Sequence, residues 1–171
     1  MDTMKTAHTE ARWSNPRIAR ILMLATYASG CIGYFIGFMR LGSDGAEVAI
    51  RPVALLSVGV VGIISMIRHS VFHRSDAIRM GWDQGRRNNF QIEVGFANLA
   101  IGIPAILAVS LGCDDVVSAA FVLAYALYFL QVGVLVLIDR PDGRINIQRL
   151  ITILIQTGLL GYFSISAIFS A

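Results

Sequence analysis

Long apolar runs, separated by short polar connections, are the most regular feature of the sequence. A run of about 20 apolar residues is long enough to cross the hydrocarbon core of a bilayer as an α-helix. Five such runs occur, at residues 18–39, 53–72, 92–111, 116–138 and 150–169. The pattern therefore predicts an all-α integral membrane bundle of five transmembrane helices, which forms one membrane domain over residues 1–171.

Residues that interrupt helices lie between these runs. Glycine, proline and aspartate gather at 42–45 with Pro52, at Gly81 and Gly85, at 112–115 and at 141–143. Residues 14–16, Ser-Asn-Pro, predict the cap of the first helix, with the proline in its first turn. The connection after the third run is very short, so we expect the third and fourth spans to form a tight antiparallel hairpin.

Basic residues alternate between rich and poor connections along the chain. Connections rich in Lys and Arg remain in the cytoplasm. Twelve basic residues fall on one side, at Lys5, Arg12, Arg17, Arg20, Arg68, Arg74, Arg79, Arg86, Arg87, Arg140, Arg144 and Arg149. Only Arg40 and Arg51 fall on the other. The pattern predicts a cytoplasmic N-terminus, a C-terminus on the far side and a cytoplasmic interfacial segment at 73–91.

The composition agrees with a membrane protein. Hydrophobic residues make up 56% of the chain and charged residues 15%, whereas soluble domains carry about 25% charged residues. The net charge is +3, but the arginines flank apolar runs and form no basic face, so we expect a lipid bilayer and no nucleic acid as partner. Cys31 and Cys113 have no CxxC spacing and are interpreted as ordinary small apolar residues.

Small residues recur at helical spacing within several runs. Such residues let transmembrane helices approach closely. They occur at Gly33 and Gly37, at Gly59 and Gly62, and at Thr157, Gly161 and Ser164. Two interpretations are open, packing within one bundle and a dimer face. Packing within the bundle is favoured, because five helices must pack somewhere.

No ionisable residue is expected at mid-depth, which counts against an ion pump or a proton-coupled carrier. The polar residues expected there are neutral: Ser57, Tyr125, Tyr128, Gln131, Gln156 and Thr157. We expect Gln131 and Gln156 to hydrogen-bond to each other or to neighbouring helices.

The stretch from Arg68 to Asn98 holds most of the candidate chemistry. His69 and His73 are four residues apart and would share one helical face. Ser75 is expected to cap a short interfacial helix at 76–82, which Gly81 or Gly85 would end. Trp82 suits the headgroup zone of a membrane.

The start of the third span carries further polar residues. One stripe at helical spacing contains Gln91, Gly95, Asn98 and Gly102, and Glu93 points to a different face. For Gln91, Glu93 and Asn98 we expect structural pairing, with Glu93 neutralising an arginine of the preceding loop. Arg86 and Arg87 are expected to form a basic collar against anionic lipid headgroups.

Two functional alternatives remain beside this structural interpretation. His69, His73 and Glu93, with or without Asp76, resemble a ligand set for zinc or iron, and one histidine could instead hold a haem. This alternative is a metal- or haem-dependent membrane enzyme. The other is a small-molecule permease, with a pocket lined by arginines, Trp82, Gln91 and Asn98. An HxxxH pair without a second motif is weak evidence, so ordinary polar residues at a helix end are favoured.

One longer motif resembles a known family. Phe72-His73, Met80-Gly81-Trp82 and the run from Phe90 to Leu99, FQIEVGFANL, resemble small bacterial multi-pass membrane proteins classed as a domain of unknown function, with a pattern like IGW…SPFQxEVGFANL. The chain departs from it at Asn88-Asn89, where the family commonly has Ser-Pro, and at Arg86-Arg87. The resemblance implies the bacterial inner membrane and directs interest to His73, Trp82, Gln91, Glu93 and Asn98.

Together these patterns predict a non-enzymatic membrane protein, either a subunit of a larger assembly or a small homo-oligomer. The sequence identifies no cofactor. The candidate functional cluster comprises His69, His73, Trp82, Gln91, Glu93 and Asn98.

Overall fold

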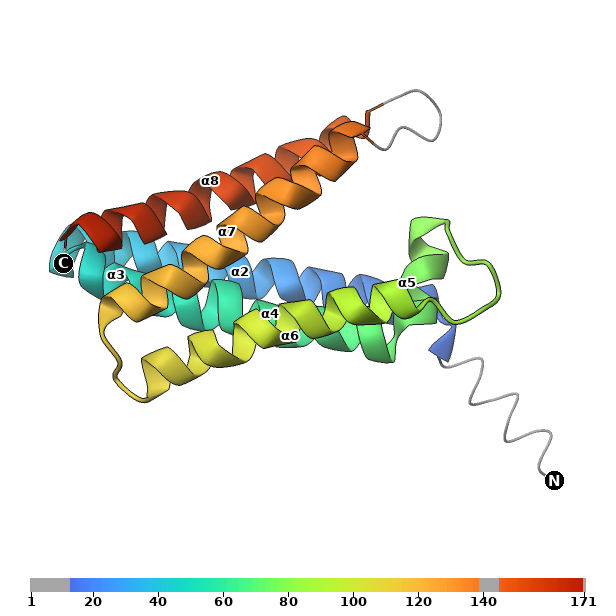
Figure 1. Ribbon diagram of the computed structural model, residues 1–171, viewed down its shortest axis with the longest axis horizontal. Helices are drawn as coiled ribbons and strands as arrows, with labels where there is room; N and C mark the ends of the chain where they lie inside the picture. The colour runs from blue at the N-terminus through green and yellow to red at the C-terminus, as the bar shows by residue number, and fades with distance from the viewer. Residues whose placement is uncertain (1–12, 139–144, 171) are drawn as a thin grey trace.

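A computed structural model describes residues 13–138 and 145–170, and nearly all of them are helical (Figure 1). Among the described residues, five helices are long and apolar enough to cross a membrane: α2 (Pro16–Asp44), a composite helix at Ala46–Val71, α6 (Asn89–Ser110), α7 (Asp115–Ile138) and α8 (Ile147–Ser170). The predicted number of long apolar helices is therefore confirmed, and each is referred to below as a span. The predicted break at 141–143 lies outside the described residues.

The second span is a composite of α- and π-helix. It consists of α3 (Ala46–Pro52), the π-helix η1 (Val53–Val60), α4 (Val61–Met66) and the π-helix η2 (Ile67–Val71). The predicted break at Pro52 is wrong, because the helix continues through this residue. A proline lacks the N–H that closes an α-turn, and the hydrogen bonding changes to the wider π pattern directly after it.

Capping residues explain most helix ends. The Asn15 side chain accepts a hydrogen bond from the Arg17 backbone N–H at 3.0 Å, and Pro16 occupies the first turn of α2, as predicted. Gly45 alone, with φ of 88°, separates α2 from α3, so the predicted break at 42–45 shrinks to one residue. Gly112, at φ of 64°, turns the chain between α6 and α7.

The short helix α5 (His73–Met80) follows the second span. It begins three residues before the predicted start, so the expectation that Ser75 caps it is wrong. Phe72 occupies the cap position. Ser75 lies inside the helix, and its hydroxyl accepts a hydrogen bond from the Ala19 backbone N–H of α2. Gly81 ends the helix in the left-handed conformation at φ of 78°, as predicted.

The helices form two groups that diverge toward one end of the bundle (Figure 1). One group contains α2, the second span and α6, with α5 at its end; the other is the α7–α8 pair. The prediction of a tight hairpin between the third and fourth spans is only partly right. The connection is short, but α7 packs mainly along α8. Tyr125 and Tyr128 of α7 contact Asn98 of α6 through their hydroxyl groups.

Close helix contacts occur at glycines, which confirms packing within the bundle for the first two predicted pairs. A Cβ built on Gly62 would lie 2.6 Å from the Asn98 carbonyl oxygen and 3.0 Å from the Gly102 Cα. One on Gly33 would meet the Ser57 hydroxyl. Gly161 differs, because a Cβ there meets nothing within 4 Å.

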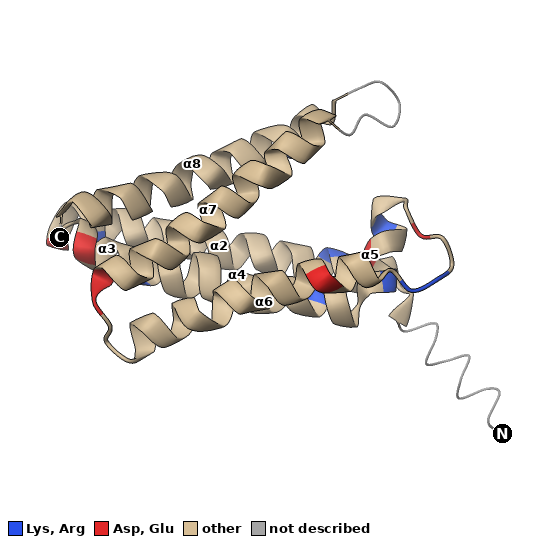
Figure 2. Ribbon diagram, in the orientation of Figure 1, with Lys and Arg blue, Asp and Glu red and all other residues tan. Residues whose placement is uncertain are grey.

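Basic residues collect at the end of the bundle where α5 lies (Figure 2). Among the described lysines and arginines, only Arg40, near the end of α2, and Arg51, in α3, lie at the opposite end. The bundle therefore has one strongly basic end, in line with the charge alternation of the sequence.

The glycine contact gives a first test. We expect Gly62→Ala to destabilise the fold by about 1–3 kcal/mol, because the added methyl group overlaps the α6 backbone. Gly158→Ala is the matched control, since a Cβ there meets nothing within 4 Å, and alanine favours a helix by about 1 kcal/mol over glycine. Thermal unfolding in detergent measures both. Equal stability of the two variants would contradict the close α4–α6 contact.

Candidate functional site

Two adjacent residues of α5, Ser75 and Asp76, are completely buried. The Ser75 hydroxyl accepts a hydrogen bond from the Ala19 backbone N–H at 3.2 Å and donates one to the Asn15 carbonyl oxygen at 2.5 Å. Ser75 therefore satisfies backbone groups at the start of α2, where a helix leaves its first N–H groups without internal partners. These bonds fix α5 against the N-terminal end of α2.

Asp76 is the centre of a buried charge cluster. Its Oδ1 accepts from the Arg79 Nε and Nη2 at 3.1 and 2.9 Å, and the Arg68 Nε lies 3.7 Å away. Its Oδ2 accepts from the Gln91 amide at 3.2 Å and lies 2.9 Å from the His69 Nδ1. One carboxylate thus joins α5 to the end of the second span and to α6.

The contacts of His69 fix its protonation. The Arg68 Nη2 lies 2.7 Å from the His69 Nε2. A guanidinium group only donates hydrogen bonds, so the Nε2 must be the acceptor and carry no proton. The proton then resides on Nδ1, 2.9 Å from the Asp76 carboxylate, although the N–H is not well aligned with the oxygen. His69 is therefore a neutral imidazole in this arrangement.

Asp76 is strongly acidic in the folded chain. Burial alone would raise its pKa, but the contact with His69 and the positive charges of Arg68 and Arg79 outweigh this effect and lower the pKa of Asp76 to about 2. The carboxylate is consequently ionised at any physiological pH.

A second polar group lies deeper in the bundle and joins α6 to α7. The Tyr125 hydroxyl donates to the Asn98 Oδ1 at 2.7 Å, and the Asn98 amide donates to the Val94 carbonyl oxygen at 2.7 Å. The Tyr128 hydroxyl lies 3.5 Å from the same amide. Asn98 and Tyr125 are both buried. Asn98 is thus hydrogen-bonded within the bundle, and the nearest side chain that bonds to it is Tyr125.

The two mid-span glutamines behave differently from each other. Gln156 on α8 accepts a hydrogen bond from the Tyr34 hydroxyl of α2 at 2.5 Å. Gln131 on α7 is exposed. Gln156 therefore bonds to a neighbouring helix, which is one of the two predicted alternatives. The other alternative, a bond between the two glutamines, is not the one that Gln156 forms.

The sequence-predicted site residues lie in several places. His69 and Gln91 meet at Asp76, whereas the His73 Nδ1 lies 3.2 Å from the Ser70 carbonyl oxygen. Glu93 is exposed on α6, and within residues 13–138 and 145–170 it forms no ion pair, so the expected pairing with a loop arginine is not seen.

The predicted metal ligands are not gathered into one group. In the described part of the chain, no three His, Cys, Asp or Glu side chains are arranged to hold a metal ion. The set of His69, His73 and Glu93 therefore stays a prediction from the sequence alone.

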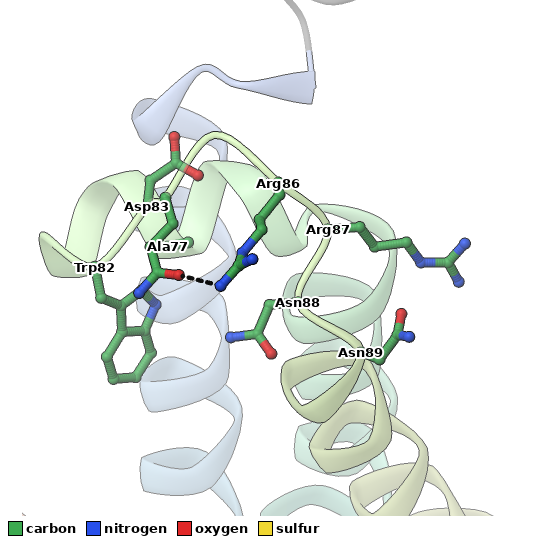
Figure 3. Close-up of a pocket in the computed structure, with 8 residues that line it drawn as sticks. Ala77, Trp82, Asp83, Arg86, Arg87, Asn88 and Asn89 are labelled. Atoms are coloured by element: carbon green, nitrogen blue, oxygen red, sulfur yellow. Dashed lines mark hydrogen bonds between the residues drawn. The ribbon is translucent and has the colours of Figure 1, made fainter.

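Trp82 and the loop arginines line an open hollow between α5 and α6 (Figure 3). Arg86 points into the loop and donates to the Gln84 amide oxygen at 3.2 Å, whereas Arg87 and Asn89 point outward. Asn88 caps α6 by accepting from the Gln91 backbone N–H at 3.2 Å. All eight lining residues except Ala77 are exposed, so this hollow is a surface feature, separate from the buried cluster.

Sequence reasoning missed the central role of Asp76 and its two arginines. In the sequence, Arg68 and Arg79 indicate only the topology. One signal was available: Asp76 and Arg79 are three residues apart and face each other on a helix. The contact of Arg68 with Asp76 had no such signal, because it depends on the direction in which α5 leaves the second span.

Comparisons with known proteins place the chain in a family without an assigned activity. The model of a family of unknown function, DUF6790, matches residues 12–140, and the chain belongs to this family. The expected membership of an uncharacterised family is thus confirmed. No curated protein and no solved structure matches the chain.

Asp76→Asn tests the buried cluster. We expect a loss of about 3–5 kcal/mol in unfolding free energy, because the substitution leaves buried arginine charges without their anion. Asp83→Asn is the matched control. Asp83 is an exposed loop residue and lies 3.9 Å from Arg74, so this substitution should cost less than about 1 kcal/mol. Similar losses in both variants, measured by denaturant unfolding, would contradict a special role for Asp76.

The pKa of Asp76 also predicts a pH dependence. A carboxylate whose folded pKa is lowered stabilises the fold above its unfolded pKa, near 3.9, and this stabilisation is lost as the pH falls toward the folded value of about 2. The difference in unfolding free energy between the native chain and Asp76→Asn should therefore shrink by about 2 kcal/mol between pH 5 and pH 2. A difference that stays constant over this range would show that Asp76 does not titrate as described.

Proposed function

We propose that the chain is a non-enzymatic, multi-pass protein of the bacterial inner membrane that assembles with a membrane partner through the outer face of α6. Its N-terminus lies in the cytoplasm and its C-terminus on the far side. Family membership assigns no reaction, so the proposal depends on charges and surfaces of the chain itself.

The basic end of the bundle supports the orientation. Arg17 and Arg20 lie at the start of α2, which Ser75 of α5 contacts, and Arg86 and Arg87 lie in the loop after α5. Arginine-rich ends remain in the cytoplasm. Trp82, exposed at the same end, suits the zone of lipid headgroups. The resemblance of the FQIEVGFANL stretch to small bacterial membrane proteins supports the bacterial inner membrane.

The use of the buried polar groups supports a structural role. The Asp76 carboxylate is completely buried, and both its oxygens contact groups of the same chain. Asn98 and Tyr125 bond to each other in the same way. A catalytic group needs access to a substrate, whereas these groups hold helices together.

The observation that carries the proposal is Glu93 on an exposed apolar stripe. The stripe consists of four exposed apolar residues of α6: Phe90 (71% exposed), Phe96 (56%), Ile103 (43%) and Leu107 (48%). Glu93 lies between Phe90 and Phe96 on the same face of the helix. An outward carboxylate in a span is costly unless a partner neutralises it. A neighbouring helix with an Arg, Lys or other hydrogen-bond donor opposite Glu93 would do so, from a second copy or from another membrane protein.

Reporter fusions test the orientation. We expect alkaline phosphatase to be active, and green fluorescent protein dark, when each is fused to the C-terminus, because an odd number of spans carries this end across the membrane. N-terminal fusions should show the reverse. Both ends in one compartment would contradict the proposed orientation.

Crosslinking tests the partner surface. A photoreactive residue in place of Phe96 should crosslink to a membrane protein, either a second copy or another chain. Glu93→Leu should reduce this crosslink at least about tenfold, because it leaves the partner's cation or donor unpaired in lipid. Ile32 on α2, 52% exposed, provides the control position. Equal crosslinks from positions 96 and 32, or no effect of Glu93→Leu, would contradict assembly through α6.

A further inference from the structure

The buried cluster around Asp76 holds more positive than negative charge. Arg68 and Arg79 each carry one positive charge, and Asp76 supplies one negative charge. His69 adds none, because its Nε2 accepts from Arg68 and the ring is neutral. Among the described residues, the ion pair with Asp76 at 3.7 Å is the one that Arg68 forms. The cluster therefore retains one uncompensated positive charge.

Of the two arginines, Arg68 has a hydrogen-bond donor that is not in use. Arg79 holds the Asp76 Oδ1 with two nitrogens at 2.9 and 3.1 Å, whereas Arg68 lies 3.7 Å from the same oxygen. The Arg68 Nε is buried and has no hydrogen-bond partner. A buried guanidinium nitrogen without an acceptor is unfavourable, and it is an unused donor.

Arg68 is also within reach of a ligand. Its side chain is 15% exposed. Tyr27 of α2 and Tyr125 of α7 lie close enough to interact with its charge. Tyr27 is itself 41% exposed.

We infer that Arg68 binds a phosphate-type oxyanion, which supplies the negative charge that the Asp76 cluster lacks. The Arg68 guanidinium would donate to the anion, with the Tyr27 hydroxyl as a second donor. The same chemistry is offered by the phosphodiester of an anionic lipid headgroup and by free phosphate. The inference is independent of assembly through α6.

Purified full-length protein in lipid nanodiscs tests this site. The melting temperature is measured in phosphatidylcholine alone, in phosphatidylcholine with phosphatidylglycerol, and in phosphatidylcholine with inorganic phosphate against chloride at equal ionic strength. Native mass spectrometry measures the lipid retained. The variants are Arg68→Gln and, as a matched control, Arg86→Gln from the exposed loop. Arg68→Gln should fold, because it brings the charge of the cluster to zero while Asp76 keeps Arg79.

We expect an anion to raise the melting temperature of the native chain and of Arg86→Gln by several degrees, and to leave Arg68→Gln unchanged. Lipid retention should fall at least about tenfold in Arg68→Gln. A shift with phosphatidylglycerol alone identifies a lipid headgroup, and one with inorganic phosphate identifies a free anion. Arg68→Lys, which keeps the charge but loses the forked donors, should bind with intermediate affinity and serves as a second variant.

Three results would overturn the inference. One is the absence of a shift with either anion in the native chain. Another is an undiminished shift in Arg68→Gln or, should that variant not fold, in Arg68→Lys. The third is a shift that Arg86→Gln abolishes, because the anion would then bind at the exposed loop.

Discussion

The buried carboxylate of Asp76 is the constraint on which the basic end of the bundle depends. An isolated ionised carboxylate inside a protein is very unfavourable, and it persists only when cations and hydrogen-bond donors surround it. Here the donors come from the second span, from α5 itself and from α6. Each of these elements must therefore occupy a defined place, since moving any one of them leaves a buried charge without its partner.

The π-helical end of the second span makes this arrangement possible. In η2 the backbone N–H of Phe72 bonds to the Ile67 carbonyl oxygen at 2.9 Å, five residues back. The wider turn ends the span, and α5 starts one residue later in a new direction. Asp76 is thereby brought back onto Arg68 and His69, and Ser75 onto the start of α2. π-Turns often accompany functional residues, and here one accompanies the cluster that holds Arg68.

The sequence could predict the spans because the hydropathy of a membrane helix is set by its solvent. The sequence could also predict the basic end from the positions of the arginines, and close helix packing from small residues such as Gly62. It could not predict that Pro52 lies inside a helix, because the π-helix that accommodates it leaves no pattern in the residues. Nor could it show that Ser75 contacts α2, since its type favours a cap and only the tertiary contact decides otherwise. The role of Arg68 was hidden for a related reason: an arginine at the end of a span is expected for topology alone.

The most direct test of the central role of Asp76 is a double-mutant cycle between α5 and α6. It compares the unfolding free energies of Asp76→Ala, Gln91→Ala and the double variant with that of the native chain. The 3.2 Å bond from the Gln91 amide to the Asp76 carboxylate predicts a coupling energy of about 1–3 kcal/mol. Losses that add to within about 0.5 kcal/mol would contradict the account, because Asp76 would then not link the two helices.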